Sequence, residues 1–187
     1  MKNEKYIISG FKASAVAAGI KNGNALDLAL IFSEREATVA GAFTTNKVKA
    51  APVILSLEHV EGGKAKAIIA NSGNANACTG KTGLNDARLT AELVAKELGV
   101  AFEEVVVAST GVIGKPLDMD LITGAIPGLV ETLSPDGIPD AARAIMTTDS
   151  FSKISMYKGL VGDVPFHILG IAKGAGMIMP HLSLIHI

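Results

Sequence analysis

The stretch "KAKAIIANSGNANAC", residues 64–78, changes character halfway along. Its first half is an apolar run that ends near Ala70, and a short run of this composition predicts a buried strand. Its second half consists of Asn, Ser, Gly and Ala, which predicts a loop that begins where the strand ends. We therefore expect functional groups to gather at this end of the strand.

The residues that follow predict a helix and then a second strand. Apolar residues recur at spacings of three and four, as on one face of a helix, at Leu84, Ala87, Ala91, Val94 and Leu98. Gly99 stands where a C-terminal cap belongs. Val105 to Ala108 predicts a strand, and Ser109, Thr110 and Gly111 predict a polar turn after it.

The flanking segments complete an α/β pattern. Residues 25–32 and 37–43 predict a hairpin around the polar turn "SERE", and residues 153–157 and 164–172 predict two more strands. Between them, Pro and Gly divide residues 118–149 into short helical pieces. Because strands begin and end the series and one pair is antiparallel, we expect one continuous α/β unit with a mixed sheet.

Composition excludes several classes of function. The 187 residues are 49% apolar, carry a formal net charge of −1 and include no Trp, so neither the basic footprint nor the stacking platform of a nucleic-acid binder is present. Apolar runs are too short for a membrane span, so we expect no membrane partner. With one cysteine and no secretory leader, we expect a cytoplasmic protein.

Residues 71–82 raise the possibility of a nucleotide site. Gly80-Lys81-Thr82 lies between a strand and a helix, which is the context of a phosphate-binding loop. The motif requires glycine five residues before Gly80, where this chain has Ala75. Nucleotide binding at this loop is the alternative hypothesis.

The four histidines lack metal-ligand spacing, so we expect neither a metal nor a cofactor.

Two other stretches are candidates for acyl chemistry. A glycine directly after a strand lets the backbone turn sharply, so Thr110 and Gly111 can direct donors at a developing oxyanion, although an ordinary turn explains the same residues. Lys173 follows an apolar strand and precedes glycines, which favours an ammonium held in a cleft as a carboxylate partner. The local sequence offers no reason for a depressed lysine pKa.

Six collinear motifs resemble one family, the ornithine acetyltransferases (glutamate N-acetyltransferases) of arginine biosynthesis. The resemblance covers about Gly10 to Ile178 and rests on "GFKASAVAAGIK", "GAFTTNKVKAAPV", "IIANSGNANACTG", "VVVASTGVIG", "AIMTTDSFSK" and "GIAKGAGMI". It implies that residues 1–178 are the alpha-chain portion of a longer precursor, and that the fold is part of a multilayer αββα sandwich completed by a beta chain.

The resemblance also implies a reaction and its participants. The precursor cuts itself before a threonine, which then carries acetyl from N-acetylornithine to glutamate in a ping-pong reaction, with acetyl-CoA as an additional donor in some members. By motif position, Thr110 and Gly111 resemble the oxyanion hole, and Ser150 and Lys173 resemble substrate contacts, with Ser150 replacing the usual Thr. The implied assembly is a hetero-oligomer of alpha and beta chains.

The final residues depart from the family pattern. Residues 179–187, "MPHLSLIHI", form an atypical tail that replaces the self-cleavage segment, and Leu184 stands where the family has its threonine. Ser183 lies one place too early to substitute, because a shift of one residue reverses side-chain direction along a strand. A non-catalytic orphan fragment is therefore a third hypothesis, and we expect the chain to be inactive alone.

We predict that the isolated chain neither cleaves itself nor transfers acetyl groups, because an aliphatic side chain at Leu184 cannot replace a hydroxyl nucleophile. Intact-mass measurement and an assay with N-acetylornithine and glutamate check this. A fragment released near Ser183, or turnover above the blank, would contradict it.

Overall fold

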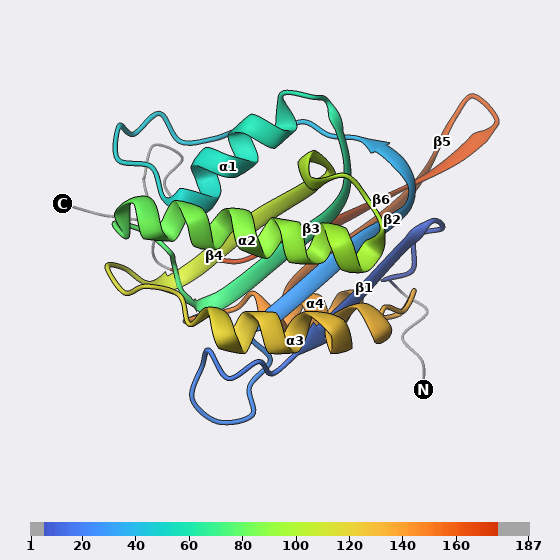
Figure 1. Cartoon of the computed structure of the whole chain (residues 1–187). Helices are drawn as coiled ribbons and strands as arrows, with labels where there is room; N and C mark the ends of the chain where they lie inside the picture. The colour runs from blue at the N-terminus through green and yellow to red at the C-terminus, as the bar shows by residue number, and fades with distance from the viewer. Residues whose placement is uncertain (1–5, 176–187) are drawn as a thin grey trace.

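A mixed four-stranded sheet forms the centre of the computed structural model, which describes residues 6–175 (Figure 1). The spatial order of the strands follows the chain: β1 (Phe11–Val16), β2 (Leu28–Thr38), β3 (Lys64–Asn74) and β4 (Val105–Val112). β1–β2 and β2–β3 are antiparallel, and β3–β4 is parallel, as expected for a mixed sheet. The expected tail at residues 179–187, with Leu184 and Ser183, lies outside the described residues.

The parallel pair is connected by the helix that the apolar spacing predicts. α2 (Gly80–Leu98) and the short 3₁₀ helix η2 (Phe102–Glu104) carry the chain from the end of β3 back to the start of β4. Ala87, Ala91 and Val94 of the predicted apolar stripe are buried. Gly99 ends α2 with φ 67°, the left-handed conformation that glycine adopts without a steric penalty. The prediction of this helix is confirmed.

Three helices cover one face of the sheet. α1 (Ala51–Val60), α2 and α3 (Met119–Glu131) lie in front of the strands in Figure 1, and their apolar side chains form the main core. Its fully buried members include Leu28, Leu30, Leu55, Ile69 and Val105. Burying a side chain such as Leu55 stabilises the fold by roughly 1.5–3 kcal/mol before entropy is counted. Most of the stability therefore comes from this face.

The other face of the sheet carries a smaller core. Leu28 and Leu30 of β2 point to the main core, whereas the alternate residue Ala29 packs with α4 (Ile138–Ala144). Behind the sheet, β5 (Lys153–Val161) and β6 (Val164–Ala172) form an antiparallel hairpin that extends beyond the body of the molecule (Figure 1). The two predicted C-terminal strands are confirmed. Their outer residues are largely exposed.

The predicted hairpin around "SERE" is wrong, because residues 33–36 lie inside the single strand β2. The polar side chains stay in the strand because they pair across it: Glu34 contacts Lys12 on β1 at 2.7 Å, and Glu36 contacts Lys64 on β3. A register shift between Phe32 and Ala37 accommodates the extra residues as a bulge.

Two predicted strand ends and one predicted helix break are also wrong. β3 continues to Asn74 and β4 to Val112, so the polar residues after Ala70 and Ala108 extend both strands. At the end of β3 the polar side chains of Asn71, Ser72 and Asn74 are buried because they find partners; Asn71 Nδ2, for example, donates to the Asn74 carbonyl at 2.8 Å. Pro127 lies within α3, where burial of Ile126 and its neighbours compensates for the missing backbone hydrogen bond.

The turn between β1 and β2 is organised by one fully buried carboxylate. Asp27 accepts the backbone N–H groups of Ala18, Gly19 and Lys21 at 2.7, 3.1 and 2.9 Å. Three donors directed at one carboxylate replace the water it loses on burial. This arrangement fixes the backbone of Lys21, whose side chain reaches the site described below.

Within residues 6–175, no helix has both the length and the apolar composition that a membrane crossing requires.

Candidate active site

The site forms where β3 and β4 end, because parallel strands bring their carboxyl ends to one edge of the sheet. Gly73 of β3 lies opposite Gly111 of β4, and the register shifts at Asn74. Gly111 has φ 135°, and a Cβ there would overlap the backbone of Gly73 and Asn74. Only glycine fits at this position, which lets the two strand ends touch directly.

The Asn-rich loop supports this contact from within. Asn74 Nδ2 donates to the carbonyls of Lys115 at 3.1 Å and Pro116 at 2.9 Å, and its Oδ1 accepts the N–H of Asn76 at 2.8 Å. Asn76 in turn donates to the Gly83 carbonyl near the start of α2. Buried side chains thus occupy the interior of the loop whose sequence resembled a phosphate cradle.

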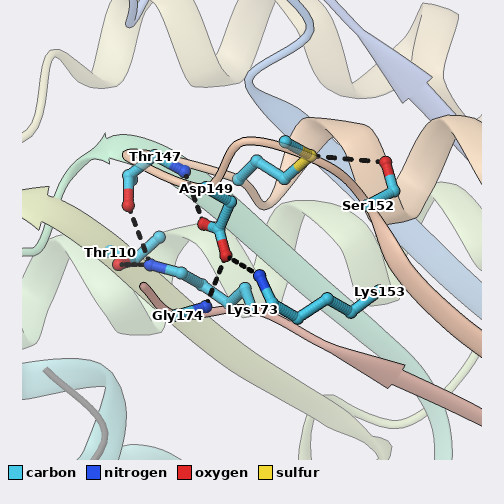
Figure 2. Close-up of polar contacts among 8 residues, drawn as sticks. Thr110, Thr147, Asp149, Ser152, Lys153, Lys173 and Gly174 are labelled. Carbon is cyan, nitrogen blue, oxygen red and sulfur yellow. Dashed lines mark hydrogen bonds and ion pairs between the residues drawn. The ribbon is translucent and has the colours of Figure 1, made fainter. Parts of the chain in front are cut away.

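Lys173 joins three segments that are far apart in the sequence. Directly after β6, its Nζ donates to Thr110 Oγ1 at 2.8 Å and to Thr147 Oγ1 at 3.0 Å (Figure 2). An ammonium has three N–H bonds, so among the described residues one N–H bond of Lys173 is left for a ligand. The Thr110 hydroxyl accepts from Lys173 and keeps its own proton for another acceptor.

A cavity of about 550 Å³ opens beside this group of residues. Its lining includes Thr110, Gly111, Val112, Ile113, Thr147 and Lys173. Val112 and Ile113 make one wall apolar and are 57% and 37% exposed, whereas Lys173 places a positive charge on another wall. This combination suits a small ligand that carries a negative charge and a short apolar group.

Three of the four predicted site residues come together here, and Ser150 does not. Thr110, Gly111 and Lys173 all line the cavity, while Ser150 is exposed and lies outside its lining. Thr147 and Thr148 of the same segment line the cavity instead. The sequence placed hydroxyl groups in this segment, but only the hydrogen bond from Lys173 singles out Thr147.

Burial and nearby charges set the state of Lys173. Burial lowers its pKa from the ordinary lysine value, Asp149 opposes this shift, and Lys153 adds to it. The local sequence gave no reason to expect a depressed pKa, because the burial arises from segments distant along the chain. The Lys173 side chain should accordingly lose its positive charge at a lower pH than an exposed lysine does.

Lys21 is a second lysine at the cavity, and it was missed by sequence reasoning. Its Nζ donates to the carbonyls of Leu26, Ala144 and Met146 at 3.1, 3.3 and 2.7 Å, so all three N–H bonds are used inside the protein. Burial lowers its pKa, and Asp27 opposes the shift. Lys21 therefore holds the chain just before Thr147 rather than binding a ligand.

The part of the chain that the structure describes contains no group of three or more His, Cys, Asp or Glu side chains placed to share a metal ion. The cavity is lined by the hydroxyl groups of Thr110 and Thr147, by backbone groups and by the Lys173 ammonium, with Lys21 beside them. Such donors stabilise negative charge that develops on an oxygen during acyl transfer.

Comparison with known proteins agrees with this class of site. The profile of the ArgJ family matches residues 12–185. The "Arginine biosynthesis bifunctional protein ArgJ" of Geobacter sulfurreducens is 53% identical over 176 residues, and its Caldanaerobacter subterraneus counterpart is 52% identical over 174. The alignments cover 94% and 93% of this chain but 45% and 43% of those proteins. The chain spans slightly less than half the length of these curated relatives, and it belongs to the ArgJ family.

Two solved structures share the fold. The ArgJ protein of Bacillus halodurans matches with a TM-score of 0.87 and 40% identity, over 92% of this chain and 90% of the solved chain. The ornithine acetyltransferase of Mycobacterium tuberculosis, solved in complex with ornithine, matches with a TM-score of 0.86 and 40% identity, over 95% and 96%. The mixed α/β fold expected from the sequence is confirmed.

We predict that Gly111→Ala destabilises the chain more than Gly114→Ala does. Both glycines have positive φ, so both substitutions incur roughly 1–2 kcal/mol of backbone strain. At Gly114 nothing lies near the added methyl group, whereas at Gly111 the overlap adds roughly a further 1–3 kcal/mol. Urea denaturation of both variants measures the difference, and equal losses would contradict the close contact between the strands.

Proposed function

We propose that this chain is the alpha half of an acetyltransferase that moves an acetyl group from N-acetylornithine to glutamate in arginine biosynthesis. The observation that carries the proposal is the Lys173–Thr110–Gly111 group at one edge of a charged and apolar cavity. Support comes from the names of the relatives, which are a bifunctional arginine biosynthesis protein and an ornithine acetyltransferase with bound ornithine.

In the proposed reaction, a threonine at the start of the other half attacks the acetyl carbonyl of N-acetylornithine. Its α-amine takes the hydroxyl proton and delivers it to the departing ornithine amine, which leaves an acetyl ester on the threonine. Glutamate then attacks the ester through its amine, which forms N-acetylglutamate and restores the threonine. Acetyl-CoA as a further acetyl donor is compatible with the same ester intermediate.

Thr110 and Gly111 have the role of oxyanion stabilisation in this proposal. Negative charge develops on the carbonyl oxygen when the threonine attacks, and the Thr110 hydroxyl donates to it. Because the Lys173 ammonium donates to Thr110 Oγ1, it polarises that hydroxyl and strengthens it as a donor. Lys173 therefore has two roles in this proposal: it polarises the Thr110 hydroxyl, and its remaining N–H is available to a ligand in the cavity.

We assign Lys173 to a substrate carboxylate, with Thr147 beside it as a hydroxyl partner. The 3.0 Å bond between their side chains supports this pairing, because it directs both groups at the same part of the cavity. Ser150 remains a predicted substrate contact, and its exposed position makes Thr147 the better supported hydroxyl. A charge-assisted hydrogen bond of this kind contributes about 1.5–3 kcal/mol.

The proposed partner is the beta chain, the other half of the relatives' length, joined in a hetero-oligomer. The chain covers 45% of the Geobacter protein but 96% of the solved Mycobacterium chain, so a relative contains a separate chain of this size. Exposed apolar side chains on the β5–β6 hairpin offer a surface for it: Tyr157, Leu160, Val161, Val164 and Ile168. We place the assembly in the cytoplasm, which suits the unpaired Cys78.

Complementation tests the proposal. This chain is co-expressed with the C-terminal half of the Geobacter sulfurreducens relative, beginning at its threonine, and conversion of N-acetylornithine and glutamate is followed by mass spectrometry. We expect the halves to co-purify and to transfer acetyl, with each half inactive alone. A stable complex that forms neither ornithine nor N-acetylglutamate would overturn the proposed activity.

In the complemented enzyme, we predict that Thr110→Ala lowers kcat about ten- to a thousandfold, the upper end being what loss of one oxyanion donor costs. Thr110→Ser keeps the hydroxyl that accepts from Lys173 and should retain most of the activity. Steady-state kinetics of both variants check this. An unchanged kcat in Thr110→Ala would remove Thr110 from the site.

We predict that Lys173→Met chiefly raises KM, by roughly ten- to a hundredfold for loss of a charge-assisted hydrogen bond, and that Lys173→Arg recovers part of the affinity. Substrate binding should weaken as pH rises through the lowered lysine pKa, because only the charged form pairs with a carboxylate. Kinetics across pH for both amino-acid substrates measure this. Loss of kcat with unchanged KM, together with loss of a basic limb of the pH profile, would instead indicate proton transfer by Lys173.

A further inference from the structure

Asp149 is a buried carboxylate to which neither the proposed reaction nor the family motifs give a role. Its side chain has no exposed surface. Oδ1 accepts the backbone N–H of Gly174 at 2.7 Å and the Lys153 ammonium at 2.6 Å, and Oδ2 accepts the N–H of Thr147 at 3.3 Å (Figure 2). Burial of a charge costs free energy unless such partners compensate for it. A buried, fully bonded carboxylate at this place in the fold therefore calls for an explanation.

The contacts of Asp149 tie together the two segments that supply the cationic side of the cavity. Thr147 donates its backbone N–H to Asp149 and presents its hydroxyl to Lys173. Gly174, the second backbone donor, directly follows Lys173. One carboxylate therefore fixes the backbone on both sides of the Lys173–Thr147 bond (Figure 2).

We propose that Asp149 is the positioning residue of the substrate-carboxylate site: it holds the backbone of Thr147 and of Gly174, and so the bond between Lys173 and Thr147, in one geometry, and it adds a negative charge to the surroundings of the Lys173 ammonium. The inference rests on the proposed function, in which Lys173 pairs with a substrate carboxylate. The inference adds that the Lys173 ammonium alone does not make this subsite. The buried Asp149 carboxylate orients the Lys173 side chain and influences its charge.

The ionised form of Asp149 is strongly favoured. The hydrogen bond from Lys153 and the N–H of Gly174 hold the pKa of the Asp149 carboxyl well below its usual range. Asp149 consequently stays negative at every pH at which the enzyme would work. A neutral amide of the same shape could keep some of the hydrogen bonds, but it would remove the charge.

That charge acts on Lys173 against two opposing effects. Burial lowers the pKa of Lys173, the Asp149 carboxylate raises it, and the Lys153 ammonium lowers it again. Lys21 is a further cation nearby, and its own pKa is lowered in part by Lys173. Asp149 therefore opposes the effects of burial and of the neighbouring lysines and favours the charged form of Lys173.

A residue that only braced the fold would behave differently. Loosening of the two segments would make Lys173 more accessible and more reactive whichever partner was removed. The proposal instead requires opposite effects: removing Asp149 should lower the pKa of Lys173, and removing Lys153 should raise it. The sign of the change thus separates a charge-setting role from a structural one.

The first experiment uses this chain and needs no activity. Lysines are acetylated briefly with trace acetic anhydride at a series of pH values, and the labelling of Lys173 is measured by mass spectrometry relative to the exposed Lys158. Asp149→Asn and Lys153→Met are the test variants. Asp140→Asn is the matched control, since it removes one carboxylate from an exposed pair with Arg143 that does not line the cavity.

We expect Asp149→Asn to increase the labelling of Lys173 about three- to tenfold at fixed pH, because a larger fraction of the side chain is uncharged, and Lys153→Met to decrease it. Asp140→Asn should change nothing. Increased labelling in both Asp149→Asn and Lys153→Met, or none in Asp149→Asn, would overturn the charge-setting role.

The second experiment measures kinetics in the complemented enzyme. Asp149→Asn should raise KM for both amino-acid substrates about tenfold, lower kcat less, and move the loss of binding at high pH to a lower pH. An unchanged KM and pH profile would overturn the positioning role. If the complemented wild-type enzyme shows no transfer at all, the proposed function fails, while the labelling experiment still decides whether Asp149 controls Lys173.

Discussion

The direct contact between the ends of β3 and β4 is the constraint on which the site depends. Parallel pairing brings both carboxyl ends to one edge, and Gly111 lets its backbone meet that of Gly73 and Asn74 there. Asn74 and Asn76 then fix the loop behind the contact through bonds to backbone groups. Thr110 consequently has one defined position, and the segments carrying Lys173 and Thr147 close around it.

Much of the fold was predictable because apolar spacing reports burial directly. α2, its glycine cap and the C-terminal hairpin follow from local patterns, and the structure confirms them. The errors in the strands have a common cause, since polar residues were interpreted as turns. Glu34 and Glu36 instead pair with lysines on neighbouring strands, and Asn71 finds a buried backbone partner. The two lysines lie far along the chain from these glutamates, where periodicity carries no information.

The residues of the site also fall into two groups, those that the sequence predicted and those that it did not. Thr110, Gly111 and Lys173 stand out locally, because each adjoins a strand end or glycines that leave space around it. Lys21 and Asp149 carry no such signal. Lys21 donates to three carbonyls and the Asp149 side chain is buried, but in the sequence neither residue differs from an exposed lysine or aspartate. The depressed pKa of Lys173 was likewise unpredictable, since its burial comes from elements separated by many residues.

Gly111 also limits which genetic changes this chain can accept. A bulky residue in a core is often rescued by a second mutation that shrinks its neighbour. At Gly111 that route is closed, because the atoms in the way belong to the backbone of Gly73 and Asn74, and no substitution removes backbone atoms. A screen for second-site suppressors of a Gly111 variant should therefore return reversion to glycine, and this position cannot drift gradually as ordinary core positions do.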